Sequence, residues 1–275
     1  GGSGTGKGVM ARSLHYTSER RSGPFVEVSC ASLPEQLLEA ELFGAEKGAY
    51  TGAHQRRAGL VALAHRGTLF LDEVGELAPT LQAKLLSFLE SHSYRPLGSA
   101  REASADVRVV AATNRDLSRD VADSRFRADL YYRLNVVPVE IPPLRDRGDD
   151  LFRLAEHFAA RFAKEEGCSP VRLGAEARAR FAAHVWPGNV RELRNLIERL
   201  TILYPGEEIT ARHLPPELAS IGAARMPLPN RFAAAERDLL LEALARASGR
   251  KGLAAKALGI SRHALKRRLK RLKLV

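Results

Sequence analysis

The sequence predicts an α/β domain built on a parallel sheet, followed by a small helical domain and a further all-α domain. Short apolar runs rich in β-branched and aromatic residues alternate with helical patterns, which is typical of βαβ units. We expect strands at residues 25–30, 67–71, 107–112 and 136–141. After Pro142-Pro143 these runs stop, and apolar residues recur every three or four positions, which indicates helices.

One helix is expected between the strands and three more after them, at residues 80–90, 151–166, 175–184 and 190–203. A stretch rich in Pro and Gly follows, and it predicts a linker because these residues interrupt regular elements. The expected boundaries are 1–143 for the α/β domain, 144–213 for the helical domain, 214–231 for the linker and 232–275 for the last domain.

The net charge of +11 is concentrated at one end of the chain. The last thirty residues hold 11 of the 43 Lys and Arg and no Asp or Glu, so the remainder is balanced. A basic segment without acidic residues is typical of a nucleic-acid-binding tail. At 275 residues, the chain is long enough for a sizeable core and for more than one domain.

Several protein classes do not fit this sequence. It has no run of about 18 apolar residues, and its N-terminus lacks the charged-then-apolar layout of a signal peptide, so we expect a cytosolic protein. Cys30 and Cys168 lie far apart without metal-ligand spacing, so neither a disulfide framework nor a zinc site is indicated. Because Gly1 lies inside a motif, we expect further sequence upstream.

The first residues fit a phosphate-binding loop. Gly1, Gly6 and Lys7 match G-x-x-x-x-G-K, in which glycines let backbone N–H groups curl around phosphates and the lysine reaches the β- and γ-oxygens. A helix that begins near Gly8 would add its positive N-terminal end. Taken alone, the pattern also fits a flexible turn. The expected nucleotide-binding residues are Gly1, Gly2, Ser3, Gly4, Thr5, Gly6, Lys7 and Gly8.

An acidic pair ends the apolar run at residues 67–71. Asp72 and Glu73 would lie at the carboxyl end of a strand, where ligands bind in open α/β sheets. We expect Asp72 to hold Mg²⁺, directly or through water, and Glu73 to act as the general base on the attacking water. The alternative is an acidic strand end that caps the next turn.

Two further groups fit phosphoryl transfer from ATP. Thr113 and Asn114 follow the run at residues 107–112, where they could lie beside the γ-phosphate and respond to its loss. Arg127 and Arg133 are candidate arginine fingers that reach the nucleotide of a neighbouring subunit and stabilise transition-state charge. Each arginine alone is more often part of a surface salt bridge.

Longer stretches resemble a known family, the bacterial enhancer-binding proteins, which are AAA+ activators of sigma-54 RNA polymerase. Residues 41–53, with the sequence ELFGAEKGAYTGA, look like the family's ELFGHEKGAFTGA segment. The match continues through GTLFLDEVGEL, VRVVAATNRDL, FRADLYYRLNVVPVEIPPLRDR and WPGNVRELRNLIER. The resemblance therefore spans essentially the whole chain, and it implies a P-loop AAA+ sheet with a helical lid, followed by a helix-turn-helix domain.

The resemblance implies roles for individual residues. Within one subunit, the implied nucleotide-contacting positions are Lys7 (Walker A), Asp72 and Glu73 (Walker B), and Thr113 with Asn114 (sensor I). The implied arginines are Arg127 and Arg133 as fingers and Arg191 as sensor II on the lid. Family members are usually hexameric rings that hydrolyse ATP at subunit interfaces.

The segment GAYTGA corresponds to the family's tip loop, which contacts sigma-54 and moves on hydrolysis to remodel the closed promoter complex. Two glycines give the backbone freedom, and one aromatic ring supplies a large rigid contact. Spacing alone does not exclude the alternative, which is a hairpin whose aromatic residue folds back onto its own domain. The implied contact residues are Gly48, Ala49, Tyr50, Thr51, Gly52 and Ala53.

The sequence departs from the family pattern at three positions. Gly8 stands where relatives usually have Glu, and Tyr50 replaces Phe, which keeps the ring and adds a hydroxyl. Ser29 stands where most relatives have Asn, the residue proposed to hold the catalytic Glu inactive until the partner is engaged. A serine hydroxyl can still bond to Glu73, with a shorter reach.

The residue pattern of the basic tail predicts a helix, a turn at Gly259 and a second helix capped by Ser261. It resembles the Fis-like domain of the same family, which dimerises and binds enhancer-like sites in double-stranded DNA. In the major groove, the expected base contacts are Arg262, His263 and Lys266. The expected phosphate contacts are Arg250, Lys251, Arg268 and Lys270, and Arg267 is expected to be exposed on the same helix. The alternative is a solvated basic helix.

Three candidate functions are consistent with the sequence, and they are given in order of their agreement with it. The first is an ATP-hydrolysing activator of sigma-54 polymerase, and the second is a DNA-binding regulator whose AAA+ module assembles without useful hydrolysis, as Gly8 and Ser29 would allow. The third is another AAA+ remodeller, such as a helicase loader. GAYTGA argues against the third, because activators of the same architecture that work on other sigma factors lack that loop.

Overall fold

The computed structural model describes residues 1–50, 55–219, 251–257 and 265. It divides into two compact units, Gly1–Glu166 with Trp186–Leu203, and Gly167–Val185 with Tyr204–Val275. Within the described ranges, no helix has both the length and the apolar character needed to cross a membrane.

A three-stranded parallel sheet forms the centre of the first unit. Its strands are β1 (Phe25–Ser29), β4 (Thr68–Asp72) and β7 (Arg108–Ala111), in the order β1-β4-β7. These are three of the four predicted strands, and their parallel pairing confirms the predicted α/β sheet. Ser29 lies directly opposite Asp72 in the register, so the two residues meet at the carboxyl edge of the sheet.

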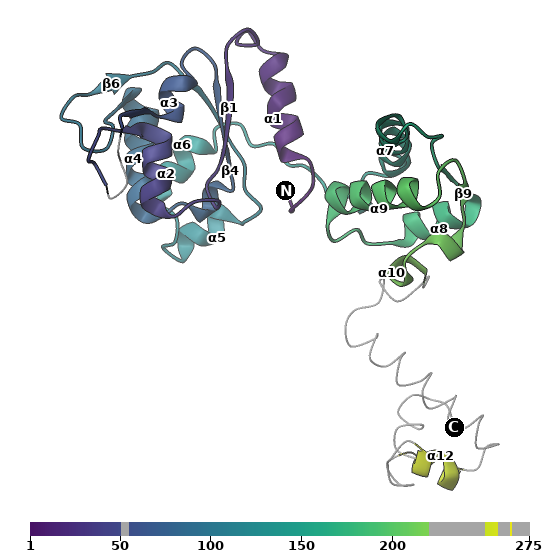
Figure 1. The fold of residues 1–275 in the computed structure, drawn as a ribbon. Helices are drawn as coiled ribbons and strands as arrows, with labels where there is room; N and C mark the ends of the chain where they lie inside the picture. Colours follow the sequence, from purple (N-terminus) through teal and green to yellow (C-terminus); the bar gives the residue numbers. More distant parts are fainter. Residues whose placement is uncertain (51–54, 220–250, 258–264, 266–275) are drawn as a thin grey trace. The chain divides into compact units, whose positions relative to one another are not determined.

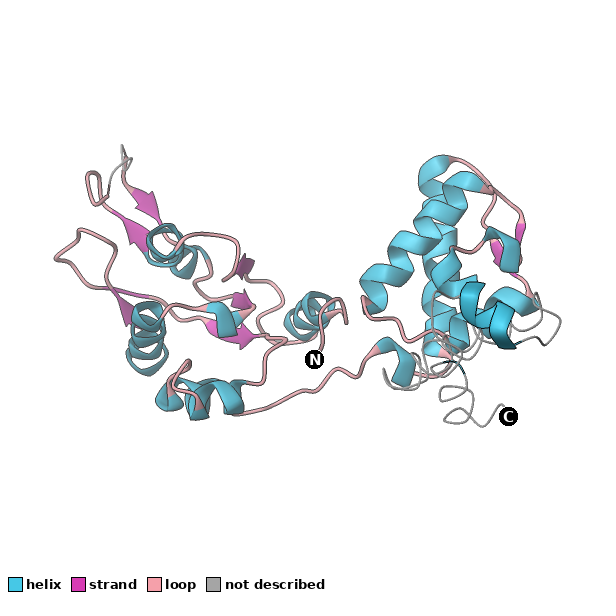
Figure 2. Cartoon of the chain, turned by 90° about the horizontal axis from the view of Figure 1, so that it is seen from below, coloured by secondary structure: helices cyan, strands magenta, loops and turns pink. Residues whose placement is uncertain are grey.

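Helices cover the sheet on both sides. Figures 1 and 2 show α1 (Lys7–Tyr16) on one side and α2 (Glu35–Phe43), α4 (Pro79–Ser91) and α6 (Ala128–Leu134) on the other. The bounds of α4 confirm the helix predicted at residues 80–90. The shorter helical elements of this unit are α3 (Leu60–Leu63), η1 (Val74–Glu76), α5 (Leu117–Ala122) and η2 (Leu144–Asp146).

Strand β4 is buried on both faces, as the uninterrupted apolar run predicts for the centre of a parallel sheet. Leu69 and Leu71 are fully buried in a core that includes Leu81 and Leu85 of α4. Phe70 packs near Phe25 of β1, at a ring separation of 6.2 Å. Burying one such side chain stabilises the fold by roughly 1.5–3 kcal/mol, so this packing fixes where β4 ends and where its acidic residues lie.

The prediction of a strand at residues 136–141 is wrong. Residues 136–141 have no strand assignment, and the side chains of Val136, Val137 and Val139 are largely exposed. A strand needs a partner with which to exchange backbone hydrogen bonds, and β7 pairs only with β4 among the described residues. Pro138 also lacks an N–H with which to pair. A composition rich in β-branched residues was therefore not enough to form a strand in this segment.

Two small hairpins project from the α/β part of this unit. The first pairs β2 (Gly44–Ala45) with β3 (Arg57–Ala58), and the second pairs β5 (Ser93–Tyr94) with β6 (Ala103–Ser104). At the base of the first, a Cβ on Gly59 would lie 2.3 Å from the nitrogen of Gly44, so only glycine allows this approach. The GAYTGA segment occupies the loop of this hairpin.

Helices α7 (Asp150–Glu166) and α9 (Asn189–Leu203) pack together in the same unit. Their buried residues follow helical spacing, with Leu151, Ala155 and Phe158 on α7 and Leu193 and Ile197 on α9. Both helices match the predicted ranges within a residue. An amphipathic pattern of this length identifies a helix reliably.

The second unit contains α8 (Ala175–Ala183), η3 (Ala211–His213), α10 (Pro216–Ala219) and the parallel pair β8 (Arg172–Leu173) and β9 (Glu208–Ile209). Helix α8 was predicted. The two short strands were not, because two-residue strands carry no alternating pattern. Helix α10 lies inside the predicted linker.

Helix α12 (Lys251–Ala257) agrees with the helix expected before the break at Gly259. The expected turn at Gly259 and nearly all of the final helix lie outside the described residues. Cys30 and Cys168 are free cysteines, in agreement with the sequence analysis.

Candidate nucleotide site

The glycine-rich loop leads directly into α1. Gly4 and Gly6 have positive φ angles of 71° and 100°, a region that favours glycine, and the helix begins at Lys7. Nζ of Lys7 donates hydrogen bonds to the carbonyl oxygens of Gly1 and Gly2, at 3.1 and 2.9 Å. The lysine is therefore folded over the loop, and the helix N-terminus supplies partial positive charge at the same place.

Residues from the helical lid hold the outer side of this loop. Nδ2 of Asn189 donates to the carbonyl of Ser3 at 2.9 Å, and the backbone N–H of Val190 donates to the carbonyl of Gly4 at 3.0 Å. Nη2 of Arg147 donates to the carbonyl of Thr5 at 2.6 Å. The carbonyls of three successive loop residues are thus engaged by hydrogen-bond donors from the lid.

Arg191 reaches the same loop, as expected of a lid arginine. Its Nη1 lies 3.2 Å from Oγ of Ser3. Asn189 and Arg147 were not singled out by the sequence analysis. Asn189 is buried with a φ of +51°, and Asn is enriched in that conformation. The Asn in the sequence WPGNV was therefore a weak signal for a residue with a special structural role.

Asp72 and Glu73 lie at the carboxyl end of β4, as predicted. Oδ1 of Asp72 accepts a hydrogen bond from the backbone N–H of Glu73 at 3.0 Å. Oγ of Ser29 donates to Oε2 of Glu73 at 3.1 Å, so the shorter side chain at this position does reach the carboxylate. Ser29, Asp72 and Glu73 are all partly exposed, which leaves both carboxylates accessible to a ligand.

The neighbouring cysteine does not take part in acid–base chemistry. Burial, followed by repulsion from the carboxylates of Asp72 and Glu73, raises the pKa of the Cys30 thiol to about 12. The thiol therefore stays protonated across the physiological range. Its backbone N–H donates to the carbonyl of Asp72 at 2.9 Å, which ties β1 to the end of β4.

Gly8 also has a local explanation. A Cβ at this position would lie 3.6 Å from Oε1 of Glu27, which pairs with Arg12 on the same face. An acidic side chain here would start beside another carboxylate. Glycine avoids that repulsion.

Thr113 and Asn114 follow β7 at the same edge of the sheet. Oγ1 of Thr113 accepts a hydrogen bond from the backbone N–H of Arg115 at 3.0 Å, and Asn114 is exposed. Val74, the residue after Glu73, donates its N–H to the carbonyl of Ala112 at 3.0 Å. The Glu73 turn and the Thr113 turn are therefore directly connected.

The two candidate arginine fingers are exposed and contact groups of their own chain. Arg127 forms a bidentate pair with Asp129, with Nη2 2.7 Å from Oδ2 and Nε 3.1 Å from Oδ1. This pairing raises the pKa of Arg127 and lowers that of Asp129. Nη2 of Arg133 donates to the carbonyl of Leu89 at 3.0 Å.

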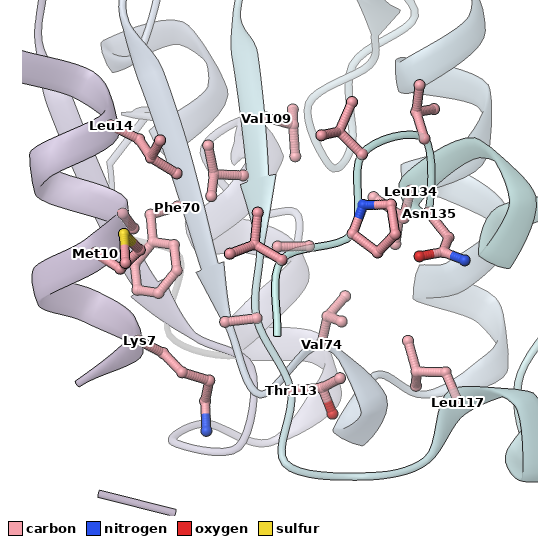
Figure 3. Close-up of a pocket in the computed structure, with 18 of the residues that line it drawn as sticks. Lys7, Met10, Leu14, Phe70, Val74, Val109, Thr113, Leu117, Leu134 and Asn135 are labelled. Atoms are coloured by element: carbon pink, nitrogen blue, oxygen red, sulfur yellow. The ribbon is translucent and has the colours of Figure 1, made fainter. Parts of the chain in front are cut away.

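A cavity of about 520 Å³ begins at Lys7 and Thr113 (Figure 3). Figure 3 shows mostly apolar side chains along the rest of its wall, such as Met10, Phe70 and Val109, together with the amide of Asn135. The end with Lys7 and Thr113 suits a phosphate, because it offers a positive charge and a hydroxyl group. Arg133 also lines the cavity.

The donor set fits Mg²⁺ bound together with a nucleotide. The described residues contain no group of three or more His, Cys, Asp or Glu that could hold a metal on its own. Mg²⁺ is usually held by one or two carboxylates together with substrate phosphates. Asp72 supplies such a carboxylate.

The remaining expected contact residues are only partly described. Gly48, Ala49 and Tyr50 lie on the loop between β2 and β3, and an ion pair between Arg56 and Glu46 at 3.3 Å braces its base. Lys251 begins α12. The other expected contacts lie outside the described residues, namely Thr51, Gly52, Ala53, Arg250, Ser261, Arg262, His263, Lys266, Arg267, Arg268 and Lys270.

Three family models match the chain in succession. Residues 1–140 match the sigma-54 interaction domain, residues 145–228 match the AAA+ ATPase lid domain, and residues 231–272 match the bacterial regulatory protein, Fis family. Together these matches confirm an AAA+ α/β fold with a lid and a helix-turn-helix domain.

Curated relatives are similar over nearly all of the chain. Nitrogen fixation protein AnfA of Azotobacter vinelandii is 44% identical over 98% of this chain and 52% of its own length. Regulatory protein AtoC of Escherichia coli K12 is 43% identical over 96% of this chain and 60% of its own length. The chain thus spans between half and two thirds of these relatives.

Solved structures of NtrX from Brucella abortus have a similar fold. One is 37% identical with a TM-score of 0.76, and the alignment covers 99% of this chain and 63% of NtrX. A second, in complex with ATP, is 37% identical with a TM-score of 0.73 over 98% of this chain and 62% of NtrX. A bound nucleotide is thus recorded on this fold.

Proposed function

We propose, because this chain belongs to the sigma-54-dependent transcriptional regulators, that it hydrolyses ATP to convert closed complexes of sigma-54 RNA polymerase into open ones. The observation that carries the proposal is the placement of Asp72 and Glu73 at the end of β4, with Ser29 bonded to Glu73. A phosphate loop alone would support binding without hydrolysis.

In this mechanism, the phosphate loop and Lys7 bind the phosphates, and Arg191 contacts them from the lid. Asp72 would hold Mg²⁺, which neutralises charge on the phosphates when bound. Glu73 accepts a proton from the attacking water, while Thr113 and Asn114 respond to the γ-phosphate. Arg127 and Arg133 stabilise transition-state charge in the site of a neighbouring subunit of a ring, which we expect to be a hexamer.

The GAYTGA loop would deliver the work of hydrolysis to sigma-54. It projects on a hairpin whose base is fixed by close glycine packing and by the pair of Arg57 with Glu41 at 3.0 Å. A rigid base supports a loop that transmits force, and Tyr50 supplies an aromatic contact. The C-terminal domain would dimerise and bind upstream DNA, which brings the motor to its promoter.

A second candidate is a DNA-binding regulator whose AAA+ module assembles without useful hydrolysis. Gly8 and Ser29, which depart from the family pattern, are the observations in its favour. The position of Asp72 and Glu73 at the carboxyl end of β4, where ligands bind in open α/β sheets, favours the hydrolytic function instead.

Substituting Glu73→Gln tests the proposed function. The amide keeps the shape of the side chain but is a poor base, so ATP turnover should fall by a factor on the order of 10² or more. ATP binding, measured by titration with a fluorescent analogue, should stay nearly unchanged. If turnover persisted at the wild-type rate, the catalytic assignment would be wrong.

A further inference from the structure

Gln82 is a buried amide that the nucleotide chemistry does not use. It lies on α4 and is 1% exposed. Its Nε2 donates to the carbonyl of Leu77 at 2.8 Å and to the carbonyl of Arg125 at 3.1 Å. Its Oε1 accepts a hydrogen bond from the backbone N–H of Arg127 at 2.8 Å. Three backbone groups from two distant segments therefore share one side chain.

The two segments have different places in the proposed mechanism. Leu77 follows the short helix η1, which begins after Glu73. Arg125 and Arg127 lead into α6, and Arg127 is its N-terminal flanking residue. Gln82 consequently joins the turn that carries the general base to the backbone that carries a candidate arginine finger.

A second polar connection runs parallel to the first. Arg115 donates from Nη1 to the carbonyl of Gly75 at 2.9 Å and from Nε to Oδ2 of Asp120 at 2.7 Å. Oδ1 of Asp120 accepts from Nε of Arg125 at 2.9 Å. Asp120 is 4% exposed, and its hydrogen bonds, chiefly the one with Arg115, lower its pKa. The same two segments are thus bridged twice.

These contacts fix the base of Arg127 and leave its tip exposed. The backbone is held by Gln82, and the adjacent Phe126 is buried. The guanidinium is about half exposed and pairs with Asp129 in its own chain. A fixed backbone with an accessible charged end suits an arginine that must reach a group on another molecule, because a small misplacement of a catalytic group costs much of its effect.

We propose that Gln82 is a positioning residue for Arg127, which it holds in register with the turn that carries Glu73. The inference rests on the proposed function, in which Arg127 acts on the nucleotide of a neighbouring subunit. Gln82 itself does not touch the nucleotide. Its amide is suited to the role because it both donates and accepts, which Glu, Met and Leu do not.

The test uses subunit mixing with the full-length chain. Gln82→Met keeps the length of the side chain and removes both donors and the acceptor, so ATP turnover should fall on the order of 10- to 100-fold through misplacement of Arg127. The site of this variant keeps its own Lys7, Asp72 and Glu73. Mixing it with Glu73→Gln subunits, which have an intact Arg127, should restore turnover.

Random mixing in equal amounts pairs an intact site with an intact arginine at roughly a quarter of the interfaces of a ring. Recovery toward that fraction of the wild-type rate supports the proposal. A matched control is Thr201→Val, which removes another buried hydrogen-bonding group, Oγ1 of Thr201, bonded to the carbonyl of Ile197 at 2.9 Å. When Thr201→Val and Gln82→Met lower the melting temperature by comparable amounts, the ATP turnover of Thr201→Val should match that of the wild type.

The reference pair is Arg127→Ala mixed with Glu73→Gln. Recovery in this pair without recovery in the Gln82→Met pair would overturn the inference and leave the proposed function standing. No recovery in either pair would overturn both the inference and the action of Arg127 on a neighbouring subunit. Wild-type turnover by Gln82→Met alone would also overturn the inference.

Discussion

At the scale of single residues, the proposed hydrolysis depends on how Glu73 is held. Its φ of 57° and ψ of 41° lie in the left-handed region, which costs a residue other than glycine roughly 1–2 kcal/mol. Hydrogen bonds between neighbouring backbone groups offset that cost, including the one from Val74 to Ala112. Strained residues that are held in this way cluster at functional sites, which agrees with a catalytic role.

Ser29→Ala removes the hydroxyl that bonds to Glu73 and leaves the strand intact. If Ser29 restrains the carboxylate, basal ATP turnover should rise by about threefold to tenfold, in line with the roughly 0.5–1.5 kcal/mol of a typical hydrogen bond. The rise should be absent in Ser29→Thr, which keeps a hydroxyl and suits a β-strand. Steady-state phosphate release measures the difference, and an unchanged rate in Ser29→Ala would refute a restraining role.

Individual site residues were predictable from the sequence when their own chemistry reveals their role. Lys7, Asp72 and Glu73 combine a distinctive type with a position next to a strand or a helix start. Gln82 and Asn189 were not predictable in this way. Their roles come from backbone groups of residues far away in the chain, and only the fold brings those groups together.

Elements of regular structure were predictable to the extent that their periodicity is long and complete. Helix α9 and strand β4 match their predicted ranges closely, because a continuous amphipathic face or apolar run leaves little choice. The segment at residues 136–141 has strand-like composition but no strand, since pairing depends on a neighbour and composition does not supply one. For the GAYTGA segment, the spacing of residues alone did not decide whether its aromatic residue folds back onto its own domain.

In the proposed function, the hairpin that carries the GAYTGA segment connects the ATPase with its partner, so changes in its loop should be separable from hydrolysis. Thr51→Ala changes a residue of the GAYTGA segment, which is not among the residues expected to bind the nucleotide. ATP turnover should stay within about twofold of the wild type, because surface changes away from a site are usually small. Open-complex formation by sigma-54 polymerase, followed by permanganate footprinting, should be lost. Transcription that survived the change would contradict the loop assignment.

The whole molecule combines an AAA+ module with a positively charged C-terminal segment, and this charge predicts how the segment would bind DNA. All of the net positive charge lies in the last thirty residues. Binding that neutralises several phosphates releases counterions, so affinity for duplex DNA should fall steeply with salt, on the order of 10³-fold between about 50 and 200 mM.

Two variants separate phosphate contacts from base contacts. Lys270→Ala should weaken binding about equally for all sequences and reduce the salt slope by about 1, whereas Arg262→Ala should chiefly reduce discrimination between sequences. Fluorescence anisotropy with specific and scrambled duplexes measures both effects. Binding by the full chain that is insensitive to salt would contradict a DNA-binding role for the tail.

The central claim of the proposed function is the coupling of ATP hydrolysis to sigma-54, and open-complex formation at a sigma-54 promoter measures this coupling directly. The purified chain should form open complexes with ATP and none with a non-hydrolysable analogue, and its ATP turnover should change when sigma-54 is added. Glu73→Gln should bind ATP and form no open complexes. Open complexes formed without hydrolysis, or none formed while ATP is turned over rapidly, would contradict a sigma-54-directed ATPase.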